Sequence, residues 1–218
     1  MEMIRPAGKT AFETAVPLLT EEQEAELDRL RPHTCFFTGH RNLPTEHLAR
    51  FTEVLFLQTE ALVYQGFDVF LCGGARGFDL CAAGAVLRLK RNHPSLRLVL
   101  ALPCPGQTKG WQSADRELYD YVCAHAEAFF LSEHYDGDCM RRRNYFLVDH
   151  AAAGLAFDTG VYRSGTAQTT RYAASRHIPV INLADILARE EAEEREQSLS
   201  SAGHDGGQEE ILQQNDKQ

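Results

Sequence analysis

The chain has 218 residues, of which 44% are hydrophobic, and both figures suit one globular domain with terminal extensions. Its net charge of −9 lies at the ends, since residues 1–33 carry −3, residues 189–218 carry −6, and residues 34–188 are neutral. Because tight non-specific binding of nucleic acid depends on excess Lys and Arg, the neutral centre argues against that class of partner.

The six cysteines are scattered, with no Cys-x-x-Cys pair and no metal-ligand spacing. Four of them lie in or beside apolar runs, so we interpret them as small buried side chains in a reducing compartment rather than disulfides or zinc ligands. The first residues lack the apolar core of a signal peptide, and no apolar stretch approaches the ~18–20 residues of a membrane span. We therefore expect a cytoplasmic protein with no metal site and no membrane association.

The first expected element is a short helix in an N-terminal extension, residues 1–33. Thr20 and Gln23 have the spacing of a capping box, and Pro32 is expected to stop the helix after Leu30. The extension either packs on the domain or is mobile.

Residues 34–188 alternate between apolar, β-prone runs and helical patterns. Expected strands span 34–39, 67–72, 96–102, 128–131, 154–158 and 179–182. Expected helices span 44 or 45–65, 78–92, 110–125, 140–152 and 164–176, with a last one from 185 into the acidic stretch. This alternation predicts an α/β fold, a Rossmann-like three-layer sandwich with a mostly parallel sheet and helices on both faces. Residues 189–218 are interpreted as an acidic, disordered tail, because from Gly203 there is little to bury.

Segments rich in Gly, Thr, Ser and charged groups follow the first five expected strands, at 38–42, 73–79, 103–111, 132–144 and 158–166. The carboxyl ends of parallel strands meet at one edge of a sheet, where ligands bind. We therefore expect these segments to converge on one binding site.

The turn at 73–79 has the strand–glycine–helix order of an anion-binding loop. Gly73 and Gly74 allow backbone N–H groups to approach a phosphate closely. Arg76 can add a bidentate charged contact, and Asp79 can cap the helix or accept from a ribose hydroxyl. A tight turn without a ligand is the alternative.

The loop after the first strand offers further ligand-binding groups. Thr38 and Gly39 can hydrogen-bond a phosphate or a base edge, and Arg41 is a second candidate cation. His40 is a candidate general base, with a plain polar loop residue as the alternative.

The segment Ser164, Gly165 and Thr166 opens a helix and forms a second candidate anion cradle. Simple capping by Ser164 is the alternative. Two cradles on one edge favour a ligand with two separated polar ends, such as a nucleotide with a ribose phosphate or diphosphate.

Three consecutive arginines stand at the start of a helix, where positive charge opposes the helix dipole. We prefer Arg142 and Asn144 as ligand-binding residues, and a solvated face is the alternative for Arg141 and Arg143.

Two further residues belong to the same edge. Trp111 can stack on a base or pack its helix against the sheet. Asp158 can bind a sugar hydroxyl, coordinate a metal, or act as an acid or base.

Four of these motifs, in this order and spacing, resemble the SLOG superfamily, which joins the DNA-processing protein Smf/DprA with the LOG phosphoribohydrolases. They are 38–41, 73–79, Arg143-Asn144 with Val148-Asp149, and Ser164-Gly165-Thr166 with Thr169. The nearest branch resembles bacterial YpsA-like proteins of unknown function. The resemblance covers about 34–188 and implies a Rossmann-like domain that binds a nucleotide or a nucleotide-derived, ADP-ribose-like ligand, without a required cofactor.

In the LOG enzymes, a Pro-Gly-Gly-x-Gly-Thr-x-x-Glu motif supplies the phosphate loop and an essential glutamate. Gly165-Thr166 matches the Gly-Thr pair, but Thr169 stands where the glutamate is expected. The resemblance therefore favours a sensor or regulatory binder over a phosphoribohydrolase. A hydrolase of N-glycosidic or phosphate bonds that uses Asp158 or His40 remains an alternative, as does a DprA-like single-strand DNA binder. A homodimer is left open.

Overall fold

The computed structural model of this chain describes residues 15–44 and 46–212, with side chains up to residue 198. Parts of the predicted extension and tail, residues 1–14 and 213–218, lie outside the described residues, as does Thr45, a predicted helix start. The chain divides into two units, Met1–Leu183 and Ala184–Gln218.

The first unit is built on a six-stranded sheet in which every neighbouring pair is parallel. The strand order is β4-β3-β2-β1-β5-β6. The strands are β1 (Thr34–Gly39), β2 (Val69–Cys72), β3 (Arg97–Leu102), β4 (Glu127–Phe130), β5 (Ala153–Phe157) and β6 (Val180–Asn182). The predicted Rossmann-like fold is confirmed, with a fully parallel sheet in place of the mostly parallel one expected.

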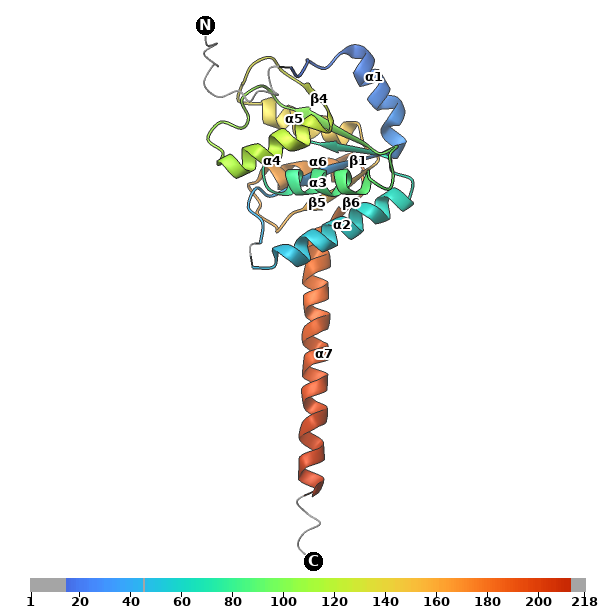
Figure 1. Ribbon diagram of the computed structural model, residues 1–218, viewed down its shortest axis with the longest axis vertical. Helices are drawn as coiled ribbons and strands as arrows, with labels where there is room; N and C mark the ends of the chain where they lie inside the picture. Colours follow the sequence, from blue (N-terminus) through green and yellow to red (C-terminus); the bar gives the residue numbers. More distant parts are fainter. Residues whose placement is uncertain (1–14, 45, 213–218) are drawn as a thin grey trace, which may run out of the picture. The chain divides into compact units, whose positions relative to one another are not determined.

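Helices cover both faces of this sheet (Figure 1). The crossover helices are α2 (Leu48–Tyr64), α3 (Phe78–Leu89), α4 (Ser113–Ala124), α5 (Cys139–Asp149) and α6 (Gly165–Ser175). Helix α3 packs against α2 and α4, and α5 packs against α6. The two faces have separate cores, because neighbouring residues of β1 point in opposite directions. Phe37 stacks on Phe70 and meets Phe78 of α3, whereas Phe36 joins a cluster with Leu147 of α5.

The order of the strands reverses at β1, which lies between β2 and β5. The register pairs Gly39 at the end of β1 with Phe157 at the end of β5. In open parallel sheets, ligands bind outside the carboxyl ends of the strands at such a reversal. The fold therefore directs the search for a site to the loops that follow β1 and β5.

The described part of the N-terminal extension packs on the domain. Helix α1 (Glu21–Leu30) begins with the predicted capping box, in which Thr20 and Gln23 bond reciprocally, and a 3-10 turn, Arg31–His33, leads into β1. The segment before α1 pairs with the edge strand β4, because Leu19 N–H donates to Phe130 O (2.9 Å) and Phe130 N–H donates to Pro17 O (2.8 Å).

Several helix limits differ from the sequence prediction by about three residues, and two of the differences are informative. Helix α2 begins at Leu48, because residues before it form a loop that lines the cavity described below. Helix α7 (Leu183–Leu212) continues past Gly203, where the sequence predicted disorder. Glu, Gln, Ala and Arg are strong helix formers and account for the helix before Gly203. Gly203, Gly206 and Gly207 are poor helix formers, so local propensity does not explain why the helix continues beyond that point. Of the helices in the described residues, none combines the length and apolar character needed to cross a membrane.

Candidate functional site

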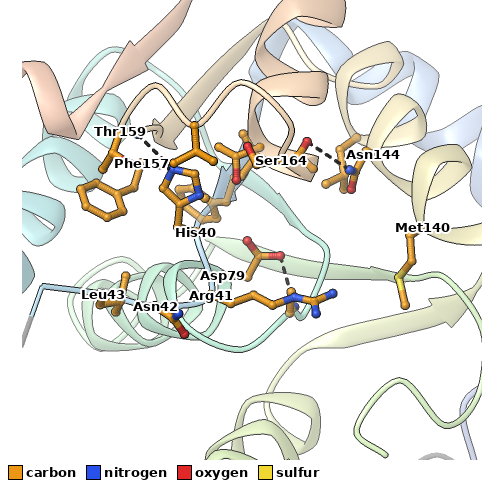
Figure 2. A pocket seen from close by; sticks show the side chains of 18 of the residues that line it. His40, Arg41, Asn42, Leu43, Asp79, Met140, Asn144, Phe157, Thr159 and Ser164 are labelled. Carbon is orange, nitrogen blue, oxygen red and sulfur yellow. Dashed lines mark hydrogen bonds between the residues drawn. The ribbon is translucent and has the colours of Figure 1, made fainter.

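A cavity of about 700 Å³ opens at the carboxyl ends of β1 and β5 (Figure 2). Nine of the predicted ligand-binding or catalytic residues line it: Thr38, Gly39, His40, Arg41, Asp79, Asn144, Ser164, Gly165 and Thr166. An apolar set completes the wall: Phe37, Leu43, Pro44, Met140, Leu147, Phe157 and Val161. The cavity has the size and the mixed lining of a small-molecule site.

The most unusual group in this wall is Arg143, whose side chain is only 8% exposed. Its Nη1 lies 3.5 Å from Asp79 Oδ2, which makes an ion pair. Among the described residues, however, Nε and Nη1 have no hydrogen-bond partner. Since a buried charge is costly unless its donors are satisfied, the guanidinium presents unmet hydrogen-bonding capacity at the cavity.

From the sequence, Arg142 was the preferred ligand-binding residue and a solvated face was the alternative for Arg143, but the structure places Arg143 in the cavity wall and Arg142 outside it. Arg143 belongs to the buried face of α5, spaced four residues from Cys139 and from Leu147. The Arg142 side chain is 48% exposed and bonds Asp136 (2.6 Å) and Ser132 (2.8 Å) instead of lining the cavity. The apolar spacing around Arg143 was the signal in the sequence that could have identified it.

Packing requires two of the glycines in the turn after β2. A Cβ on Gly73 would collide with the Arg143 guanidinium, so this glycine makes room for the buried charge. Gly77 has φ +80°, and a Cβ there would collide with the backbone carbonyls of His40 and Arg41. Of the turn's residues, Ala75 and Asp79 line the cavity, whereas Gly73 and Gly74 do not. The turn therefore contributes mainly by positioning Asp79 and Arg143.

Asp79 is the acidic partner at the centre of this arrangement. Its Oδ2 accepts from the backbone N–H of Ala75 (3.2 Å) in the glycine turn, whereas the predicted capping is not seen, because α3 has no side-chain cap. Burial raises the pKa of Asp79 from 3.8 to about 6, against the opposing effect of Arg143. Figure 2 shows the side chain of Arg41 extending beside this carboxyl group.

This raised pKa gives a measurable pH dependence of stability. Because the folded state holds the proton on Asp79 more tightly than the unfolded chain, the contribution is complete below pH 3.8 and is lost as the pH rises through about 6. A pKa difference of this size corresponds to roughly 3 kcal/mol. We expect Asp79→Asn to remove that part of the pH dependence when unfolding by urea is compared at pH 4 and pH 7.5. If the free energy of unfolding changes equally between pH 4 and pH 7.5 in the variant and the native chain, the raised pKa of Asp79 is contradicted.

The start of α6 forms the opposite wall of the cavity. The Ser164 hydroxyl accepts from Ala167 N–H (3.0 Å), so it caps the helix as the alternative interpretation expected. The N–H groups of Gly165 and Thr166 belong to the first turn, where no intrahelical carbonyl can accept them. Asn144 Nδ2 approaches Gly165 O (3.5 Å), which joins α5 to this helix start. An anion in the cavity would meet both Arg143 and the positive end of α6.

Thr169 stands one turn further along α6, where the resembling enzymes carry their glutamate. Its hydroxyl donates to Gly165 O (2.8 Å), and the residue is fully buried. Thr169 does not line the cavity, so it offers no acid there and no ligand contact.

The two candidate catalytic residues lie together beside the cavity. His40 Nε2 is 3.7 Å from Asp158 Oδ1 and accepts from the backbone N–H of Thr159 (3.0 Å). The carboxylate of Asp158 is already engaged, because Gly160 N–H and the Thr170 hydroxyl each donate to it (3.0 Å). His40 lines the cavity and Asp158 does not. This geometry suits Asp158 to holding its loop rather than to direct contact with a ligand.

The remaining predicted residues, Arg76 and Trp111, line a second cavity of about 800 Å³. The ring of Trp111 meets buried Tyr119 edge-to-face, 5.7 Å between centroids, and also borders this cavity. Both interpretations of Trp111 are therefore compatible with its position. Within the residues that the structure describes, no cluster of three His, Cys, Asp or Glu side chains has the arrangement of a metal site.

Comparison with known proteins gives one family-level match. A model described as the YspA SLOG family matches residues 39–183. The UPF0398 protein BH1768 of Halalkalibacterium halodurans is 33% identical over 94 residues, which cover 42% of this chain and 50% of that protein. The SPbeta prophage-derived protein YoqJ of Bacillus subtilis is 29% identical over 122 residues, 50% of this chain and 71% of that protein. The match with BH1768 thus spans about half the length of that relative.

Two solved structures share the fold. DNA processing protein A from Helicobacter pylori, whose structure addresses its single-stranded DNA binding mode, aligns with a TM-score of 0.54 and 15% identity. The alignment covers 72% of this chain and 67% of that one. DNA processing protein A from Streptococcus pneumoniae aligns with a TM-score of 0.51 and 17% identity, over 72% of this chain and 51% of that one.

Proposed function

This chain belongs to the YspA SLOG family, and from the chemistry of its cavity we propose that it binds a small anionic nucleotide derivative and acts as a sensor or regulatory binder. The observation that carries the proposal is the buried guanidinium of Arg143, whose Nε and Nη1 lack hydrogen-bond partners among the described residues. A phosphate would supply acceptors for these donors.

The walls around Arg143 suit the other parts of a nucleotide. The first turn of α6 offers backbone N–H groups and the Thr166 hydroxyl to the phosphate. Phe37, Leu43 and Phe157 supply apolar surface for a base or sugar face. Asp79 and Asn144 are polar groups that can orient ribose hydroxyls.

The identity and contacts of the residues at the acidic positions favour binding over cleavage. Thr169 replaces the glutamate of the resembling enzymes, and Asp158 is held by Gly160 and Thr170. Asp79 is the remaining acid in the described wall, and its ion pair with Arg143 suits it to binding. A hydrolase in which His40 acts as general base is the second candidate, because His40 borders the cavity.

Titration calorimetry of the full chain against AMP, ADP-ribose and NAD tests the proposal. We expect saturable binding of at least one of them, with no product detected by chromatography after incubation. Mass spectrometry of the denatured, freshly purified protein is expected to identify a nucleotide-type ligand that co-purifies. The proposal would be contradicted if none of the three ligands binds and mass spectrometry finds no co-purified nucleotide-type ligand.

Single-stranded DNA is tested separately, because two solved structures that share the fold are DNA processing proteins. The neutral charge of residues 34–188 leads us to expect weak DNA binding. Tight binding that falls steeply with salt in a gel-shift assay would favour a nucleic-acid partner instead.

A further inference from the structure

The second cavity adjoins the first, because Arg41 and Met140 line both. Its volume is about 800 Å³, similar to the 700 Å³ of the first. Each is of the size that takes one compact ligand group, since small-molecule sites measure roughly 300–1,000 Å³. The site therefore has two compartments, which share Arg41 and Met140 in their linings.

The second compartment concentrates positive charge in a region that is otherwise neutral. Arg41, Arg76 and Lys109 line it, and no acidic side chain occurs in its described lining. Arg76 donates a long hydrogen bond to Asn42 Oδ1 (3.5 Å), and the carboxylate that could neutralise it, Asp115, lies 3.9 Å away. Residues 34–188 carry no net charge, so this gathering of cations is local. Its chemistry favours a phosphate-bearing group.

Aromatic side chains accompany these cations. Trp111 is half-buried and held against Tyr119, and the 72% exposed Tyr135 lies on the lining of the same compartment. Aromatic faces beside cations are the arrangement that proteins use to stack nucleic-acid bases while binding their phosphates. The compartment thus suits a second base or ring, with Trp111 as its firmly positioned platform.

We propose that the ligand consists of two ring-bearing halves joined by a phosphate bridge, with one half in each compartment and the bridge at Arg41. This inference rests on the proposed function and specifies its ligand. The first half occupies the cavity around Arg143 and α6, and the second stacks on Trp111 beside Lys109. Arg41 lines both compartments, and a guanidinium can bind a phosphate bridge through two parallel N–H donors.

Binding of three probes to the full chain tests this arrangement: AMP for one half, NAD for a diphosphate bridge, and a linear adenine dinucleotide for a phosphodiester bridge. We expect one of the bridged probes to bind at least about 5-fold more tightly than AMP, because stacking of an additional base raises affinity by about 5-fold or more. The bridged probe that binds more tightly identifies the type of bridge.

The variants Trp111→Ala and Lys109→Met locate the second half. Each is expected to remove most of the advantage of the bridged probe while changing AMP affinity less than about two-fold. Lys90→Met, at the C-terminal cap of α3, is the matched control and should change neither affinity. Thermal unfolding of each variant checks that the fold is retained.

Two failures can be told apart in this experiment. If no probe binds, the proposed function itself fails. If AMP binds but neither bridged probe binds more tightly, or if the advantage survives in both Trp111→Ala and Lys109→Met, only the two-compartment ligand is overturned.

Discussion

Replacing Arg143 by Met is expected to weaken nucleotide binding by about 30-fold or more, because truncating a buried charge that binds an anion costs roughly 2–5 kcal/mol. Met fills much of the same space, so the packing of α5 against the sheet is preserved. The variant also removes the cation that opposes the rise in the pKa of Asp79, so Asp79 should stay protonated to a higher pH. Calorimetric titration with the tightest-binding nucleotide of the panel measures the loss.

Arg142→Met is the matched control for this prediction. The neighbouring arginine is half-exposed and bonds Asp136 and Ser132 outside the cavity. Its loss should leave nucleotide affinity within about two-fold, since exposed ion pairs contribute at most about 1 kcal/mol. Equal losses of affinity in the two variants, or a larger loss in Arg142→Met, would refute the role assigned to Arg143.

Gly77→Ala is expected to destabilise the fold by about 3–5 kcal/mol. A left-handed backbone with a side chain costs roughly 1–3 kcal/mol, and the added Cβ would also collide with the carbonyls of His40 and Arg41. Those carbonyls cannot move freely, because Phe78 N–H donates to His40 O (3.1 Å). The loss is a large part of the 5–15 kcal/mol that stabilises a typical domain. Urea unfolding measures it.

The neighbouring glycine of α3 provides the contrast. Gly84 lies within the helix, and a Cβ there would meet nothing within 4 Å. Gly84→Ala should therefore stabilise the protein by about 0.5–1 kcal/mol, through the better helix propensity of Ala. A Gly77→Ala variant as stable as the native chain would show that the loop after β1 does not depend on the glycine turn.

Periodicity and glycine turns in the sequence were sufficient to predict the fold and the edge of the sheet at which the candidate site lies. Apolar runs of four to seven residues predicted the strands, and in a parallel sheet the polar segments at their carboxyl ends must converge. The sequence could not decide between Arg142 and Arg143, because adjacent residues of a helix differ by a rotation of about 100° and the helix orientation is set by packing. Cys139 and Leu147 favoured Arg143 for the interior, but a charged residue on an apolar face is ordinarily exposed.

The packing roles of the glycines also could not be predicted from the local sequence pattern. Gly73 leaves space for a guanidinium that comes from a helix 70 residues further along the chain, and Gly77 leaves space for carbonyls of the loop after β1. A phosphate loop and a packing contact place the same demand on the residue, namely the absence of a side chain. Only the three-dimensional neighbours distinguish them.

The pairing of the N-terminal segment with β4 affects how readily the protein aggregates. An uncovered edge strand offers a row of backbone donors and acceptors to any other extended chain, and so promotes aggregation. Pro17 and Leu19 satisfy Phe130 from outside the sheet, and Arg97 binds Glu26 of α1 (2.7 Å) as well as Glu127 of β4 (2.6 Å). The segment thus covers part of this edge of the sheet, and its release would expose backbone groups that can pair with another chain.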